Sequence, residues 1–357
     1  MADDELSGGM ERAAADPLES GSSTNEALVA APMKKADARK RLALPDTAVL
    51  FAVLAVLVIF FSITSQYFLN ADNLINILQN TARIGIVACP ATLLLISGQF
   101  DLSVGSAAAF VAMVAAIAAA TSGSPITPGL PLWAALLAGV VAALLVGLLN
   151  AVSVTVFRIN ALITTLATLA ILRGLTKVAS DGQTVRLEEF TWLGTARVLG
   201  LPIPVYIFAV VVGVFFFISR YTTYGRSMYA IGASPTAARL AGIRTDRAIF
   251  IAFILSAAGA GLSGLILVSQ VGSASPNAGI GLELAVVTAV VLGGASLSGG
   301  RGSIVGTTLA VLIIGVLGNG LIQLAVPSYW IDVAGGALLL VAVGFDQARV
   351  RFSHATG

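Results

Sequence analysis

Long apolar runs alternate with short polar connections along most of the chain. A transmembrane helix needs on the order of 20 apolar residues, so these runs predict about ten membrane spans. None of the runs alternates in the manner of a barrel strand, and backbone groups must be paired inside lipid, which favours helices. We expect an all-α, polytopic membrane bundle over residues 46–350, with spans at 46–66, 74–97, 102–121, 131–156, 161–178, 202–219, 247–270, 283–297, 303–324 and 328–345.

The composition supports a membrane protein. The chain is 57% hydrophobic and only 11% charged, with a mean hydropathy of +0.94, which no soluble domain tolerates. Residues 1–45 are rich in Ala, Ser, Gly, Pro and acidic residues, and they lack a basic start followed by an apolar core. They predict a disordered tail rather than a cleavable signal. Residues 351–357 form a short C-terminal tail in this interpretation.

The distribution of basic residues predicts the orientation in the membrane. Loops that carry Lys and Arg stay in the cytoplasm. The connections 67–73, 122–130, 271–282 and 325–327 carry neither residue, and only 179–201 breaks the pattern, with Arg186 and Arg197 balanced by acidic residues. If about ten helices alternate, both termini are cytoplasmic and all other basic connections lie on the same side. These connections contain Lys34, Lys35, Arg39, Lys40, Arg41, Arg158, Arg220, Arg226, Arg239, Arg244, Arg247, Arg301, Arg349 and Arg351.

Several classes of chemistry are excluded by the residues that the chain lacks. Cys89 and His354 are the single cysteine and the single histidine, so internal disulfides, His/Cys metal sites and Cys–His nucleophile pairs are excluded. None of the four lysines follows a glycine, so the phosphate-binding loop of an ATPase is absent. No basic patch is interleaved with aromatic residues, so nucleic-acid binding has no support. We therefore expect a protein that is not an enzyme and has no cofactor.

A polar interruption between two apolar runs predicts a short helix over about 232–242, parallel to the membrane surface. Ser234 is a suitable N-cap, Pro235 follows at the first helical position, and Gly242 stands where a left-handed residue ends a helix. The helix would present Ala238 and Arg239 to a partner. An ordinary solvated loop helix is the alternative.

Three carboxylates, Asp101, Glu283 and Asp332, lie in or beside the apolar runs. Ionisable groups at membrane depth are costly, about 2.5–3.5 kcal/mol on insertion scales, and are therefore functional candidates. Asp101 and Glu283 also suit the positive end of a following helix, so capping is the alternative for both. Residues 98–106 fit either a tight cytoplasmic turn or a break in a helix that lines a cavity.

Polar side chains also recur within the spans. Asn160, Thr164 and Thr168 share one helix face, and Asn150, Asn319 and Gln323 are polar at depth. Such side chains either line a pathway or bond to backbone and neighbouring helices. The candidate pathway or gate residues are Asp101, Ser103, Asn160, Thr164, Thr168, Glu283 and Asn319.

Four stretches, spread over about residues 46–350, resemble the membrane permease subunit of bacterial ATP-binding-cassette sugar importers of the ribose/xylose/inositol type. One of them, 98–106, is similar to Gly-Gly-x-Asp-Leu-Ser-Val-Gly-Ser, except that Gln99 replaces the usual Gly. The others are 157–175, with Thr165-Leu166-Ala167-Thr168 and Arg173-Gly174; 224–243; and 293–306, followed by Asn319-Gly320.

The resemblance implies a permease of the bacterial inner membrane that is surrounded by membrane lipid, dimerises, and works with two other proteins. These are a cytoplasmic ATP-binding-cassette ATPase and a periplasmic or lipid-anchored substrate-binding protein. It also implies that 232–242 is the coupling helix that docks on the ATPase, with Gly232, Ala233, Ser234, Pro235, Ala238, Arg239 and Gly242 as the coupling residues.

The predicted function is therefore translocation of a monosaccharide or polyol by alternating access, driven by a separate ATPase. One alternative is a secondary transporter that acts alone, with protons moving through Asp101 and Glu283. Another is an ATP-binding-cassette permease for branched-chain amino acids or nucleosides. The small number of buried charges favours a neutral polyhydroxyl cargo.

Overall fold

The computed structural model describes residues 46–120 and 128–354, and helices dominate both ranges. The helices are α1 (Asp46–Thr64), α2 (Ala71–Ile96), α3 (Val104–Ala119), α4 (Leu132–Thr155), α5 (Ala161–Ala179), α6 (Trp192–Thr195), α7 (Ile203–Tyr221), α8 (Thr223–Ala233), α9 (Pro235–Leu240), α10 (Thr245–Val271), α11 (Leu282–Leu292), α12 (Ile304–Gln323) and α13 (Ser328–His354). The predicted tail 1–45 lies outside the described residues.

The all-α, polytopic fold predicted from the apolar runs is confirmed. In the described part of the chain, α1, α2, α4, α5, α7, α10 and α12 are long and apolar enough to cross a membrane. Shorter apolar helices are α3, with 16 residues, α11, with 11, and the 328–344 part of α13. The number of crossings therefore stays a prediction.

Helix α13 continues to His354, beyond the predicted end of the last span at 345 and into the predicted tail. Hydropathy marks the part of a helix that faces lipid, and it does not mark the end of the helix. No proline or glycine follows Gly344 before residue 355, so the helix continues through polar residues.

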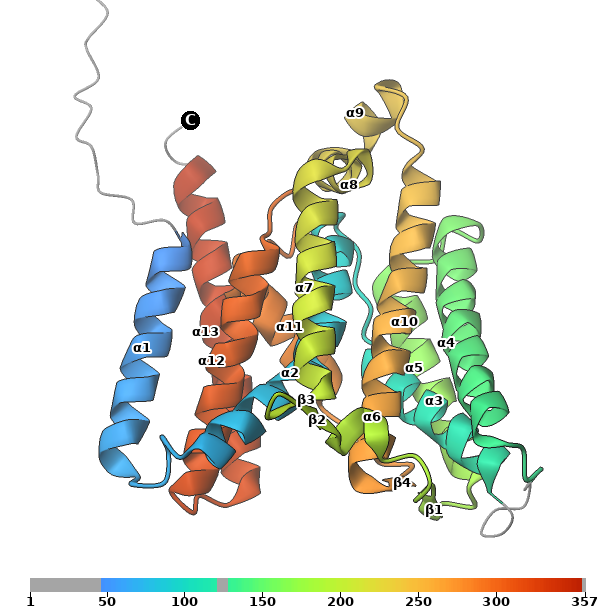
Figure 1. The fold of residues 1–357 in the computed structure, drawn as a ribbon. Coiled ribbons are helices and arrows are strands. Elements are labelled where there is room, and N and C mark those ends of the chain that lie inside the picture. Colours follow the sequence, from blue (N-terminus) through green and yellow to red (C-terminus); the bar gives the residue numbers. More distant parts are fainter. Residues whose placement is uncertain (1–45, 121–127, 355–357) are drawn as a thin grey trace, which may run out of the picture. The chain divides into compact units, whose positions relative to one another are not determined.

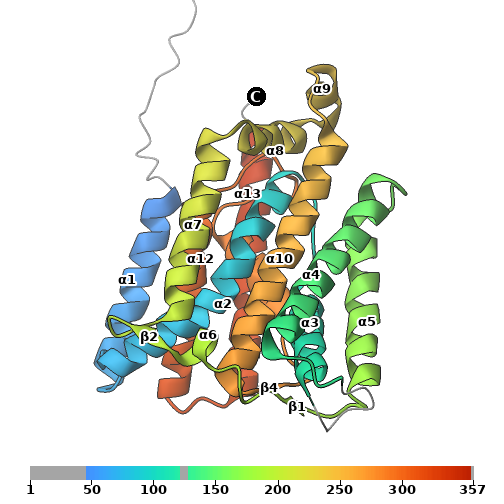
Figure 2. The same cartoon turned by 45° about the vertical axis from the view of Figure 1, so that its right-hand side comes forward.

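Helices α2 and α10 form the centre of the bundle, with α3, α4, α7 and α12 packed around them (Figures 1 and 2). Two thirds of the apolar window of each central helix is buried, against about a tenth for the peripheral α1 and α7. The largest fully buried side chains of these two helices include Ile86, Leu93, Phe253 and Ile266. Because exposed apolar side chains of the outer helices face lipid, this exposure is normal for a membrane bundle.

Four short strands lie in connections between helices of the described chain, and β3 reaches the first residue of the predicted span 202–219. β1 (Val185–Arg186) pairs antiparallel with β4 (Ser273–Ala274), so that Val185 is opposite Ala274. β2 (Arg197–Val198) and β3 (Leu201–Pro202) form a hairpin that precedes α7. Both pairs lie at the end of the bundle opposite α8 and α9 (Figure 1).

The two ends of the bundle differ in their exposed residues. We name the end that carries α8 and α9 the basic end, because it holds the arginines of the 156–160 turn, of the region 220–247 and of the turn before α12. The described chain begins and ends there (Figure 1). Tyr67, Trp133, Trp192 and Trp330 are exposed near the opposite end. Trp and Tyr gather at membrane interfaces, so these side chains place that end at a lipid headgroup layer.

A cluster of amide side chains joins α2 to α12 near the opposite end. Asn73 donates to the Asn319 Oδ1 and the Phe68 carbonyl oxygen, each at 2.9 Å. The Asn73 Oδ1 accepts from Asn319 at 2.9 Å and from Gln323 at 2.8 Å. Asn73 is buried, so these bonds hold two helices together where water is scarce. Asn319, a candidate pathway residue, belongs to this cluster.

Replacing Asn73 with Ala should therefore destabilise the purified protein. It leaves the amides of Asn319 and Gln323 without their partner, and we expect a loss of about 1–2 kcal/mol. The matched control is Asn277→Ala, since Asn277 is exposed. Thermal unfolding in detergent measures both. Equal midpoints for the two variants would contradict the assignment of the cluster as a helix-joining contact.

Candidate functional site

The connection between α2 and α3 is a buried break in the helix, over residues 97–103. Gly98 has a φ of 78°, a left-handed conformation that favours glycine, and it ends α2. The Gln99 N–H donates to the Leu94 carbonyl oxygen at 3.1 Å and the Gly98 N–H to that of Leu95 at 2.8 Å. This pair of bonds is a Schellman motif. Residues 99–101 belong to neither helix nor strand, and the chain descends into the bundle before α3 begins (Figure 1), so the segment is longer than a tight turn.

Asp101 lies in this break and is buried, and its carboxylate accepts three hydrogen bonds. The Ser103 N–H and hydroxyl donate to the Asp101 Oδ1 at 3.0 and 2.6 Å. The Ser256 hydroxyl of α10 donates to the Asp101 Oδ2 at 2.7 Å. A carboxylate in an apolar interior is tolerated only when its oxygens are satisfied in this way.

The hydrogen bonds continue beyond Ser103 to two further helices. Asn150 of α4 donates to the Ser103 Oγ at 2.9 Å, and Thr168 of α5 donates to the Asn150 Oδ1 at 2.7 Å. All of these side chains are buried. We name Asp101, Ser103, Asn150, Thr168 and Ser256 the Asp101 network. It joins the start of α3 to α4, α5 and α10 through side chains alone.

The remaining candidate pathway residues do not join this network. The Asn160 Oδ1 caps α5 by accepting from the Leu162 and Ile163 N–H groups at 2.9 and 3.4 Å. The Glu283 Oε1 accepts from the Gly281 N–H at 3.2 Å at the start of α11. The contact of Glu283 fits the capping alternative given for it, and that of Asn160 fits the alternative of bonding to the backbone. The buried Thr164 hydroxyl has no partner among the described residues.

Sequence reasoning missed Ser256, and it noted Asn150 only as polar at depth. Ser256 stands in a helix rich in small residues, in which a serine is unremarkable. Its partner is 155 residues away along the chain, and no local spacing shows such a contact. Thr168 carried a signal, because it lies on the polar face of α5.

The predicted single helix over 232–242 is wrong in its extent. Gly232 and Ala233 belong to the end of α8, and Ser234 separates this helix from the short α9. Ser234 is extended, with φ −160° and ψ 103°, because an N-cap residue needs that backbone to accept from the N–H of Ala237, here at 3.2 Å. Gly242 has a φ of 83°, the left-handed conformation expected at the end of this element.

Helix α8 is fastened to the bundle by two partly buried tyrosine side chains. The Tyr224 hydroxyl donates to the Ala248 carbonyl oxygen and the Tyr229 hydroxyl to that of Gly302, each at 3.0 Å. Burial raises the pKa of Tyr224, and it raises the pKa of Tyr229 against the opposing effect of Arg220. Both groups therefore stay neutral donors at physiological pH, and α8 is held to α10 and to the turn before α12.

Gly232 lies in a close backbone contact. The Gly300 N–H donates to the Ile96 carbonyl oxygen at 2.8 Å, and a Cβ on Gly232 would collide with both of these atoms. The end of α8 therefore touches the end of α2 and the turn before α12. This inward position separates Gly232 from the exposed surface of α9.

On α9, the side chains divide into an inward and an outward set. Ala238 is only 4% exposed, whereas Leu240 is 85% exposed. Arg239 is also exposed, and its Nε donates to the Pro235 carbonyl oxygen at 3.4 Å. Arg239 and Leu240 are therefore exposed side chains of α9, whereas Ala238 packs inside.

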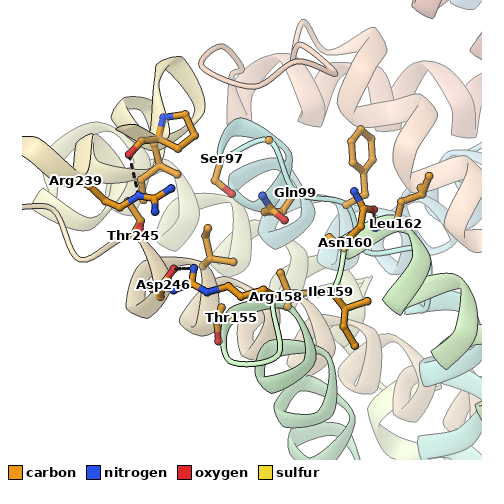
Figure 3. A pocket seen from close by; sticks show the side chains of 17 residues that line it. Ser97, Gln99, Thr155, Arg158, Ile159, Asn160, Leu162, Arg239, Thr245 and Asp246 are labelled. Carbon is orange, nitrogen blue, oxygen red and sulfur yellow. Dashed lines mark hydrogen bonds and ion pairs between the residues drawn. The ribbon is translucent and has the colours of Figure 1, made fainter. Parts of the chain in front are cut away.

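A cavity of about 550 Å³ lies between α9, the 97–100 part of the break, the 156–160 turn and the start of α10 (Figure 3). Arg158 and Asp246 line it and form a two-bond ion pair with both N–O distances at 2.8 Å. The side chains of the pair are 61% and 46% exposed, so water screens it and its effect on stability is small. The cavity places Gln99 and Arg239 on the walls of the same space.

Comparison with known proteins shows similarity to permeases of transport systems. The family described as "Branched-chain amino acid transport system / permease component" matches residues 73–343. The chain is 38% identical to the ribose import permease protein RbsC of Escherichia coli, over 83% of this chain and 92% of that permease. It is 37% identical to RbsC of Bacillus subtilis, over 84% and 92%, and 39% identical to the L-arabinose transport system permease protein AraH of Escherichia coli, over 74% and 79%. No solved structure matches.

Replacing Gly232 with Ala should push α8 away from α2 and lower stability. Overpacking of this kind costs about 1–3 kcal/mol. Gly213→Ala in α7 is the matched control, since no atom lies within 4 Å of the Cβ position there. We expect the control to be neutral or slightly stabilising, by up to about 1 kcal/mol. Thermal unfolding in detergent compares the two, and an equally stable Gly232→Ala protein would refute the close contact.

Proposed function

Because the chain belongs to the permease family of the branched-chain amino acid transport systems, we propose that it imports a monosaccharide or polyol as the membrane subunit of an ATP-binding-cassette importer. The observation that carries this proposal is the 38% identity to a ribose import permease over 83% of this chain and 92% of that permease. The subunit is not an enzyme, and ATP is hydrolysed by a separate ATPase.

The names of the relatives favour a sugar over an amino acid. The related permeases of Escherichia coli and Bacillus subtilis are named for the import of ribose or the transport of L-arabinose, although the family description names branched-chain amino acids. The Asp101 network supports a neutral cargo, since the buried carboxylate is already occupied by three donors. The same bonds count against a proton path through Asp101. A permease for nucleosides or branched-chain amino acids is the second candidate.

The partners follow from the importer assignment. We propose a cytoplasmic ATPase at the basic end, a substrate-binding protein at the opposite end, and a second copy of this chain beside the first in the bacterial inner membrane. The positive-inside pattern supports this orientation, with both termini in the cytoplasm. The exposed Arg239 and Leu240 of α9 are the side chains that contact the ATPase in this proposal.

Transport proceeds by alternating access in this proposal. Binding of ATP draws two ATPase subunits together, and α9 carries that displacement into the bundle. Helix α10 begins five residues after the end of α9, and α8 is fastened to the ends of α2 and α12. A movement of α9 therefore reaches the central helices through short connections.

The test of the function is uptake into vesicles by the complete importer. Vesicles holding this chain, its ATPase and its binding protein should accumulate labelled ribose or arabinose only when ATP is present. The chain alone should accumulate neither sugar, with or without a proton gradient. Uptake of leucine in place of a sugar would move the assignment to the second candidate, and uphill uptake by the chain alone would overturn it.

Replacing Leu240 with Asp should uncouple the ATPase from the permease. A charged side chain at an exposed contact point weakens docking, and we expect uptake to fall about tenfold or more. Insertion and thermal stability should not change, because Leu240 packs against little of the chain itself. Leu240→Met is the control. Ala238 is unsuitable for this test, since its buried side chain makes any loss ambiguous. Full uptake by Leu240→Asp would exclude α9 as the docking element.

The orientation is testable with single cysteines, because the native Cys89 is buried. Leu240→Cys on α9 should react with a membrane-impermeant maleimide in inside-out vesicles and stay unlabelled in right-side-out vesicles. Leu199→Cys, in the hairpin at the opposite end and 94% exposed, should show the reverse. Labelling of Leu240→Cys from outside the cell would invert the proposed topology.

A further inference from the structure

The Asp101 network is a continuous series of side-chain hydrogen bonds that runs from α10 through the break and α4 to α5. We propose that it couples α10 to α5, with Asp101 as a positioning residue, so that the break 97–103 and these two helices move as one unit during transport. The inference rests on the proposed function, because it concerns how a displacement of α9 reaches the interior of the bundle.

The direction of every bond in the network is fixed by the carboxylate. Asp101 accepts from the hydroxyls of Ser103 and Ser256. Each hydroxyl has one proton, so neither can donate a second hydrogen bond elsewhere. The Ser103 oxygen is then left to accept from Asn150, and the Asn150 oxygen accepts from Thr168. All donors therefore point toward Asp101, and loss of one link leaves a buried group without its partner.

The network lies well inside the bundle and not at its surface. Ser256 follows the first residue of α10 by eleven positions and Thr168 follows that of α5 by seven. At a rise of 1.5 Å per residue, these positions are about 16 and 10 Å along their helices from the basic end. Since α10 follows α9 directly and residues 97–100 line the cavity beside α9, both α10 and the break adjoin the docking element.

The buried face of helix α5 is poor in large apolar side chains, so its polar contacts contribute more to its attachment. The buried residues are Ala161, Thr164, Thr165, Thr168, Leu172 and Thr176. Thr165 and Thr176 donate to carbonyl oxygens of α5 itself, at 2.9 and 2.7 Å. Among the hydrogen bonds of these buried threonines in the described chain, the bond from Thr168 to Asn150 is the one that reaches another helix. Arg173 of α5 also donates to the Pro276 and Ala278 carbonyl oxygens beyond the end of α10, at 2.8 and 2.7 Å. The bond from Thr168 is therefore the link from α5 into the Asp101 network, and it acts beside this second contact.

The experiment uses the complete importer in vesicles and measures the sugar molecules transported per ATP hydrolysed. Ser256→Ala cuts the network at α10, and Thr168→Val cuts it at α5. Each should lower the ratio about tenfold, the size of a typical coupling between sites. Ser263→Ala and Thr165→Val are the matched controls, because both residues are buried on the same helices outside the network, and they should keep the wild-type ratio.

The double variant distinguishes a connected unit from two independent losses. If the network acts as one element, Ser256→Ala combined with Thr168→Val should lower the ratio no further than either change alone. A multiplied loss, or a wild-type ratio in both single variants, would overturn the inference. Lower uptake with proportionally lower ATPase activity would also overturn it, since that pattern reports only less folded protein. Should the wild-type importer itself transport no sugar, the proposed function fails instead.

Discussion

A carboxylate inside a membrane protein needs donors for its oxygens, and Asp101 obtains them from three directions. This requirement explains why the chain breaks between α2 and α3, since an uninterrupted helix has no free N–H to offer at Ser103. It also fixes the neighbours of the break, because Ser256 and Asn150 must lie within hydrogen-bond reach. The arrangement of α3, α4, α5 and α10 thus depends on one buried charge and its donors.

The basic end carries a different set of contacts, which suit the proposed transfer of a displacement from the ATPase to the helices of the bundle. Helix α8 is held by the hydrogen bonds of the partly buried Tyr224 and Tyr229 and by the close contact at Gly232, whereas Leu240 of α9 is exposed. In the proposed importer, α9 is the exposed element that contacts the ATPase, and α8 beside it is fixed to the bundle. The open cavity next to α9 leaves room for the 97–100 segment to move.

The sequence predicts those features that depend on neighbouring residues. Apolar runs predicted the helices, and local capping chemistry predicted the roles of Ser234 and Gly242. The division of 232–242 between α8 and α9 was missed, because the extended Ser234 also had to end the preceding helix. The inward position of Gly232 and the bond from Ser256 depend on segments more than 60 residues away in the chain. Such pairs leave no periodic signal in one sequence.

The central claim is that α5 and α10 move together, and distances between spin labels test it directly. Labels at Ile163 on α5 and Ile251 on α10 occupy exposed positions, and a label at Val56 on the peripheral α1 provides a reference. In the assembled importer, addition of ATP should change the distances from Val56 to both other sites while the distance from Ile163 to Ile251 stays constant. A change between Ile163 and Ile251 as large as the changes to Val56 would contradict the account.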